Sequence, residues 1–141
     1  MNELRWNRLI LAGLAAGAVL LAGETFLNSF LLGLDWQQVF LELRVAPMST
    51  SAAVMIVLIT VLLGLVQAWL IARLQQNPAV TVTRSVMESA CFVWLTVFAY
   101  TGTWLALLAV FPVRIMALGI VWGLGECVLS GLTAAWIYGR R

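Results

Sequence analysis

The chain has 141 residues, of which 63% are hydrophobic and 10% are charged, and its net charge is +2. A soluble domain is typically about 45–50% apolar and about 25% charged. This composition therefore excludes a water-soluble enzyme, a disordered chain and a nucleic-acid-binding domain. Because the chain has no His, no Lys and only two cysteines, we expect no histidine catalysis, no metal site and no cofactor. Both Cys91 and Cys127 are expected to be buried thiols.

Four apolar runs are long enough to cross a bilayer as helices, which takes about 20 residues. They cover residues 9–34, 51–73, 86–110 and 113–138. The first run is longer than the apolar part of a signal peptide, which has about 7–15 residues, so we interpret it as a membrane helix. The sequence predicts an all-α protein with a single transmembrane domain over residues 1–141. That domain is a four-helix bundle with a short interfacial helix between spans one and two.

Arginines predict the orientation of the bundle. Four spans place both termini on one side, and only Arg44 and Arg114, of eight arginines, fall on the other side. The positive-inside rule then makes both termini cytoplasmic.

Glycines in spans one and four have the spacing that permits close helix packing in a membrane. They are Gly13 and Gly17 in the first span, and Gly119 and Gly123 in the fourth. We expect these four residues to lie at helix contacts.

The segment 35–45, between spans one and two, has an amphipathic pattern. Its apolar residues share one helical face: Trp36, Val39, Phe40 and Leu43. We predict a short helix on the outer interface, capped by Asp35 and ended by Pro47. Two interpretations stay open, an anchor that orders the loop, or a helix that binds a partner or guards a substrate.

Three further positions carry local predictions. Gln67, in the second span, is expected to hydrogen-bond across helices. Ser85 and Glu88 have the spacing of a capping box and predict the start of the third span. The tight turn at 111–113 contains a proline and makes spans three and four antiparallel neighbours.

Glu24 and Glu126 are the most informative residues of the chain. Each lies within about one turn of the bilayer midplane, counted at 1.5 Å per residue. Ionised carboxylates cost at least about 2.5 kcal/mol there, so we expect both groups to be neutral. Asn28 shares a helical face with Glu24, and Ser130 shares one with Glu126, while Thr60 and Tyr100 lie at a similar depth in their spans. Together they predict an intramembrane polar layer of Glu24, Asn28, Thr60, Tyr100, Glu126 and Ser130.

Several interpretations of this polar layer stay open. It is a proton or cation relay, a pocket for a polar headgroup or small molecule, or a contact for a partner helix. Alternatively, the carboxyl groups only hydrogen-bond across the bundle and fix its register.

Residues 23–33 have the pattern Gly23-Glu24-x-x-Leu27-Asn28-x-x-Leu31-Leu32-Gly33, followed by Trp36. Near the other end, Phe111-Pro112-x-Arg114 precedes Val121-Trp122-Gly123-Leu124-x-Glu126. Together these residues resemble a family of small bacterial four-span membrane proteins of unknown function. The resemblance implies four helices and a bacterial inner membrane, and it implies no activity.

Short loops leave no room for a catalytic domain, so we do not expect an enzyme. Our leading hypothesis is an accessory or assembly subunit that sits in the lipid bilayer and packs against other membrane proteins, or against copies of itself. The alternative is a small proton- or cation-coupled transporter that uses Glu24 and Glu126. A third hypothesis is a lipid-binding membrane protein with these carboxyl groups at a headgroup pocket. No nucleic-acid partner is expected.

Overall fold

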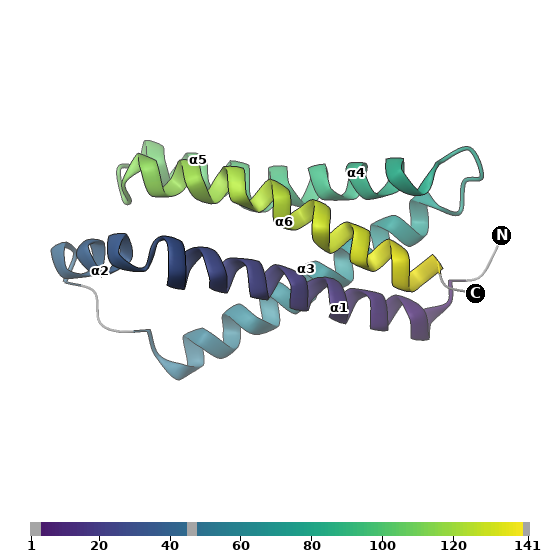
Figure 1. Cartoon of the computed structure of the whole chain (residues 1–141), viewed down its shortest axis with the longest axis horizontal. Coiled ribbons are helices and arrows are strands. Elements are labelled where there is room, and N and C mark those ends of the chain that lie inside the picture. Colours follow the sequence, from purple (N-terminus) through teal and green to yellow (C-terminus); the bar gives the residue numbers. More distant parts are fainter. Residues whose placement is uncertain (1–3, 45–47, 140–141) are drawn as a thin grey trace.

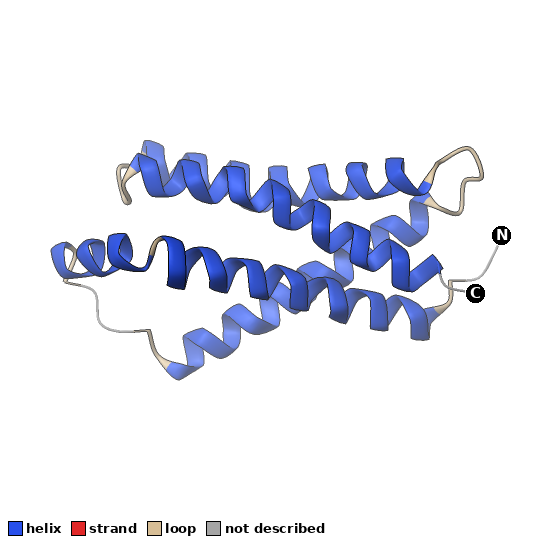
Figure 2. Ribbon diagram, in the orientation of Figure 1, coloured by secondary structure: helices blue, strands red, loops and turns tan. Residues whose placement is uncertain are grey.

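A computed structural model describes residues 4–44 and 48–139, and every regular element within them is a helix (Figures 1 and 2). The elements in the first half are α1 (Trp6–Phe26), the π-helical segment η1 (Leu27–Leu31), α2 (Gly33–Glu42) and α3 (Thr50–Leu74). Those in the second half are α4 (Val82–Val93), the π-helical segment η2 (Trp94–Ala99), α5 (Tyr100–Leu107) and α6 (Val113–Gly139).

Four continuous helical stretches are long and apolar enough to cross a membrane, and they are Trp6–Leu31, Thr50–Leu74, Val82–Leu107 and Val113–Gly139. Each overlaps one predicted span, so the all-α four-helix prediction is confirmed. Because these stretches are helical, their backbone groups bond within each segment, as a membrane requires, and their apolar side chains suit the lipid.

Figure 1 shows α1 beginning and α6 ending at the same end of the bundle, which we call the terminal end. At this end, the Arg5 guanidinium donates to the Tyr138 carbonyl oxygen at 2.9 Å. The opposite end carries α2, and we call it the α2 end. The cytoplasmic position of the termini and the bacterial inner membrane stay predictions, and Arg140 and Arg141 lie outside the described residues.

α3 crosses α1 at a steep angle, and its first turns diverge from the rest of the bundle towards the α2 end (Figure 1). Glycines on both helices form the crossing point. A Cβ atom on Gly64 would lie 2.6 Å from the Gly17 Cα, and one on Gly13 would lie 2.7 Å from the Leu65 Cα. Gly13 and Gly17 therefore lie at a helix contact, and their partner is α3.

The two glycines of α6 that were expected at helix contacts differ from each other. A Cβ on Gly123 would lie 2.8 Å from Cε1 of Phe98, so this residue lies at the contact between α6 and η2. Gly119 has no atom within 4 Å of its Cβ position. The expectation of close packing at Gly119 is therefore wrong for the described chain, because a cavity lies beside that position.

Helix starts differ from two sequence predictions. α4 is capped by Thr81, whose hydroxyl accepts from the Arg84 backbone N–H at 3.2 Å, so the helix begins one turn before the predicted capping box. Ser85 is buried and donates to the Val82 carbonyl, while Glu88 pairs with Arg84 at 2.5 Å. The capping-box prediction is wrong because Thr81 caps α4, and Ser85 and Glu88 both lie inside the helix.

α2 was expected to be capped by Asp35, but Leu32 is its N-cap residue and makes no side-chain cap bond. Asp35 lies in the first turn instead, where its Oδ1 is 3.7 Å from the Arg114 guanidinium. The predicted end of this segment at Pro47 falls outside the described residues. One cysteine also differs from expectation, since Cys91 is exposed while Cys127 is buried.

Candidate functional site

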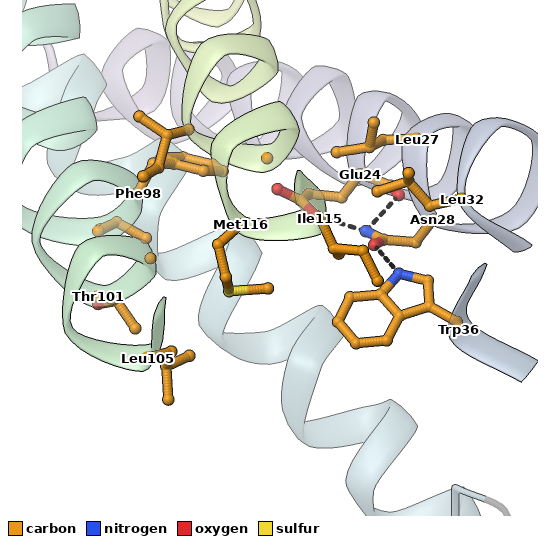
Figure 3. A pocket seen from close by; sticks show the side chains of 14 residues that line it. Glu24, Leu27, Asn28, Leu32, Trp36, Phe98, Thr101, Leu105, Ile115 and Met116 are labelled. Carbon is orange, nitrogen blue, oxygen red and sulfur yellow. Dashed lines mark hydrogen bonds between the residues drawn. The ribbon is translucent and has the colours of Figure 1, made fainter. Parts of the chain in front are cut away.

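A chain of hydrogen bonds joins α2 to the end of α1. The Trp36 indole N–H donates to Oδ1 of Asn28 at 2.8 Å, and the Asn28 amide donates to Oε2 of Glu24 at 2.7 Å. The same amide also donates to the Glu24 carbonyl oxygen at 2.9 Å. Figure 3 shows these three side chains in sequence, and we call them the Glu24–Asn28–Trp36 chain.

The sequence explains how these residues meet. Glu24 and Asn28 are four positions apart and therefore share a helical face. The helical register is interrupted at Leu32, after η1, and the Trp36 side chain of α2 then reaches Asn28. The Trp36 ring packs edge-on to Phe111, with centroids 5.4 Å apart, and so holds α2 against the start of α6.

The predicted apolar face of α2 is partly buried against the protein and partly exposed. Val39 is buried with Leu27 and Ile115, and Trp36 packs beside this cluster. Phe40 and Leu43 are exposed. Trp36 was expected to contribute to an interfacial anchor, but its indole lies against the protein because Asn28 offers its N–H an acceptor.

Two cavities share the Glu24–Asn28–Trp36 chain as part of their walls. The large cavity has a volume of about 770 Å³ and is walled by α1, η1, α2, α3 and η2. The small cavity has a volume of about 180 Å³ and is walled mainly by η2, α5 and α6 on its other side (Figure 3). Both are lined by Glu24, Asn28, Trp36, Val97 and Phe98.

Both π-helical segments contribute to the cavity walls. η1 supplies Asn28 and Ser29, and η2 supplies Val97 and Phe98 from the opposite wall. A π-helical turn is rare, and it occurs frequently at functional sites because it redirects side chains at a cost in regular packing. Its presence on two facing walls supports the interpretation of the large cavity as a site.

Glu126 lies in the middle of α6 and contacts α1 at Gly23. A Cβ on Gly23 would lie 2.6 Å from the Glu126 carboxyl carbon, so the glycine makes room for this group. Oε1 of Glu126 accepts from the Trp122 indole N–H, and Oε2 has no hydrogen-bond partner among the described residues. Glu126 is only 4% exposed, and its carboxyl group lies against Gly23, the residue directly before Glu24. The structure therefore brings the two glutamates of the predicted layer together.

The other residues of the predicted layer are distributed differently. Thr60 is buried, lines the large cavity and donates its hydroxyl to the Ile56 carbonyl at 2.8 Å. Tyr100 is 70% exposed and lies outside the cluster. Its inclusion in the layer was wrong because the wider turn of η2, directly before it, rotates the faces that follow. Thr101 faces the small cavity instead.

Ser130 belongs to a second polar cluster, separate from the cavities. Its hydroxyl lies 2.7 Å from Oε1 of Gln67 and 3.0 Å from the Ala16 carbonyl oxygen. The Gln67 amide donates to the Cys127 carbonyl oxygen at 2.7 Å. This buried cluster joins α1, α3 and α6, and it bears out the interpretation of Gln67 as a residue that bonds across helices.

We expect Gln67→Leu to lower the free energy of unfolding in detergent by about 1 kcal/mol, because hydrogen bonds between membrane helices average about 0.6 kcal/mol and two contacts are lost. Val66→Leu is the matched control, since Val66 is the preceding residue and is exposed. Equal stability of the two variants, measured by titration with a denaturing detergent, would contradict a stabilising role for the cluster.

No group of three or more His, Cys, Asp or Glu side chains within the described ranges is placed to hold a metal ion. The fold and site define the chain as an all-α protein with four helices suited to span a membrane and a polar chain shared by the walls of two cavities. No family model, no curated protein and no solved structure matches it. The resemblance to small bacterial four-span proteins therefore depends on the quoted residues alone.

Proposed function

We propose that the protein binds a small apolar or amphipathic molecule, taken from the bilayer into the large cavity. One observation carries this proposal, which is a largely apolar cavity of about 770 Å³ with the Glu24–Asn28–Trp36 chain in its wall. Small-molecule sites have volumes of about 300–1,000 Å³ and combine apolar walls with a few fixed polar groups. The proposal develops the lipid-binding hypothesis of the sequence and requires no catalytic group.

The divergence of α3 supports entry from the side. Ile56 and Ile59, on the diverging half of α3, line the large cavity and are 49% and 51% exposed. The cavity is therefore continuous with the lateral surface of the bundle. In a bilayer that surface faces acyl chains, so a membrane-dissolved molecule reaches the site without crossing an aqueous phase.

Ile59→Trp tests the proposal, because a larger side chain at this wall fills part of the cavity. We expect wild-type protein, purified in mild detergent, to retain a bound small molecule in native mass spectrometry. Ile59→Trp should lose most of this occupancy. Leu58→Trp is the matched control, since Leu58 is the neighbouring residue, is exposed and does not line the cavity. Equal occupancy in both variants, or an empty wild-type protein, would overturn the proposal.

A second candidate is the accessory or assembly subunit, and a specific observation favours it. Residues 54–59 of α3 are all exposed in the described chain, so this half of the helix has an apolar surface that a partner helix would cover. A photo-crosslinker at Met55 should then capture one membrane protein, or a second copy of this chain. The same group at Leu129 of α6, which is similarly exposed, is the control. Equal labelling of many proteins from both positions would contradict this candidate.

A further inference from the structure

The hydrogen-bonding groups in the wall of the large cavity are unevenly divided between donors and acceptors. Most of the donors are already used inside the protein. The Thr25 hydroxyl donates to the Leu21 carbonyl at 2.7 Å, and the Thr60 hydroxyl donates to the Ile56 carbonyl. The N–H groups of Asn28 and Trp36 are used within the Glu24–Asn28–Trp36 chain.

Acceptors remain available to a molecule in the cavity. Asn28 bonds to Oε2 of Glu24, which leaves the Oε1 side of this carboxyl group for a ligand. The hydroxyl oxygens of Thr25 and Thr60 keep lone pairs, and the Ser29 hydroxyl can serve either role. No arginine is among the described residues that line the cavity. A polar group entering the cavity therefore meets acceptors and a carboxyl group, with no cation beside them.

We propose that the large cavity selects molecules in which an apolar chain carries a head that donates hydrogen bonds and has no negative charge, an alcohol or an amine. The inference rests on the proposed function and specifies its ligand. Buried polar groups need hydrogen-bond partners, and an uncompensated one costs free energy. An alcohol or amine gives the Glu24 carboxyl group such a partner. An anionic head would instead face a second acidic group and few donors.

The remaining wall suits the apolar chain of such a molecule. Leucine, isoleucine, valine and phenylalanine side chains from α1, α3 and η2 make up this part of the cavity: Leu20, Leu21, Ile59, Leu63, Val97 and Phe98. With the head at Glu24, the chain would extend along these residues towards the opening beside α3. A site that binds one end by hydrogen bonds and the rest by apolar contact discriminates mainly through the polar end.

The test compares four probes with the same sixteen-carbon skeleton, added to full-length protein in phosphatidylcholine nanodiscs. They are hexadecan-1-ol, hexadecylamine, hexadecanoic acid and methyl hexadecanoate, and native mass spectrometry measures the occupancy. We expect the alcohol and the amine to bind at least about tenfold more tightly than the acid and the ester, a factor expected when a buried acceptor gains a donor. If the acid or the ester binds as tightly as the alcohol, the inference is overturned.

Glu24→Gln separates the two favoured heads. The neutral Glu24 carboxyl group can give its proton to a bound amine and form a carboxylate–ammonium pair. Gln keeps an oxygen that accepts from Asn28 but has no such proton to give, so amine binding should fall by about tenfold and alcohol binding by less than about threefold. Glu88→Gln is the control, because Glu88 is exposed on α4 and outside both cavities. Unchanged amine and alcohol binding in Glu24→Gln would contradict a head site at Glu24.

The failure of this inference and that of the proposed function give different results. If all four probes bind equally and Ile59→Trp blocks all of them, the cavity binds apolar chains and the proposed head selectivity is wrong. If Ile59→Trp changes the binding of none of them, the proposed function itself is wrong.

Discussion

Replacing Gly64 with leucine should separate α1 from α3 and lower the free energy of unfolding by about 3 kcal/mol, the upper part of the usual range for overpacking. A Cβ at this position already meets the backbone of Gly13 and Gly17, and not only flexible side-chain ends. Backbone atoms of two packed helices move only together, so the helices must shift apart. Because membrane helices associate through close packing, the loss falls on the main contact between α1 and α3.

Gly125→Leu is the matched control for this substitution. Gly125 is an exposed helical glycine with no atom within 4 Å of its Cβ position, so leucine there projects into the surroundings. We expect this control to have at least wild-type stability, since leucine favours a helix more than glycine does by about 0.8–1 kcal/mol. Titration with a denaturing detergent compares the two variants. Similar midpoints for Gly64→Leu and Gly125→Leu would show that the crossing tolerates the added volume.

Asn28→Leu should have the second large effect, because Asn28 is the only link between Glu24 and Trp36 in the hydrogen-bond chain described above. Leucine has a similar size but neither donates nor accepts. The substitution leaves the Trp36 N–H and Oε2 of Glu24 without their partner, and each unsatisfied group costs about 1–3 kcal/mol when buried. We expect α2 to detach from the end of α1, and binding in the large cavity to fall by at least about tenfold.

Hydrogen exchange of the α2 backbone amides measures the first effect, and native mass spectrometry measures the second. Ser29→Leu is the control for hydrogen exchange, because Ser29 is adjacent on η1 and is exposed, and Glu88→Gln, outside both cavities, is the control for binding. Faster exchange in α2 is expected for Asn28→Leu and not for Ser29→Leu. If α2 keeps its protection in Asn28→Leu, the aromatic contact of Trp36 with Phe111 alone holds the helix.

The sequence predicts the fold well because hydropathy and length decide which segments cross a membrane. Glu24, Asn28 and Glu126 were also found from the sequence, since a carboxyl group in an apolar run is costly and an i, i+4 spacing places neighbours on one face. Gly13 and Gly17 were recognised by their spacing. Their partner Gly64 was not, because a single glycine in an apolar helix has no pattern of its own.

The rest of the site depends on departures from regular helix geometry, and counting residues cannot detect them. Trp36 meets Asn28 only because the helical register is interrupted at Leu32, and Tyr100 leaves the cluster because η2 changes the register before it. Phe98, which lies in η2 and lines both cavities, has no sequence signal beyond its apolar side chain. A rule for π-helical turns, which the hydropathy pattern does not contain, would have been needed to find it.

The glycine crossing of α1 and α3 has a mechanical consequence for the cavity. Gly64 lies at the crossing, near the middle of α3, and the helix extends from there to Thr50 over about 21 Å, counted at 1.5 Å per residue. Rotation of this segment by about 10° would move its Thr50 end by about 4 Å, from that length and simple trigonometry. Such a rotation would change the volume beside Glu24 without breaking a hydrogen bond of the helix. The angle at which α3 crosses α1 therefore sets the width of the cavity's lateral opening.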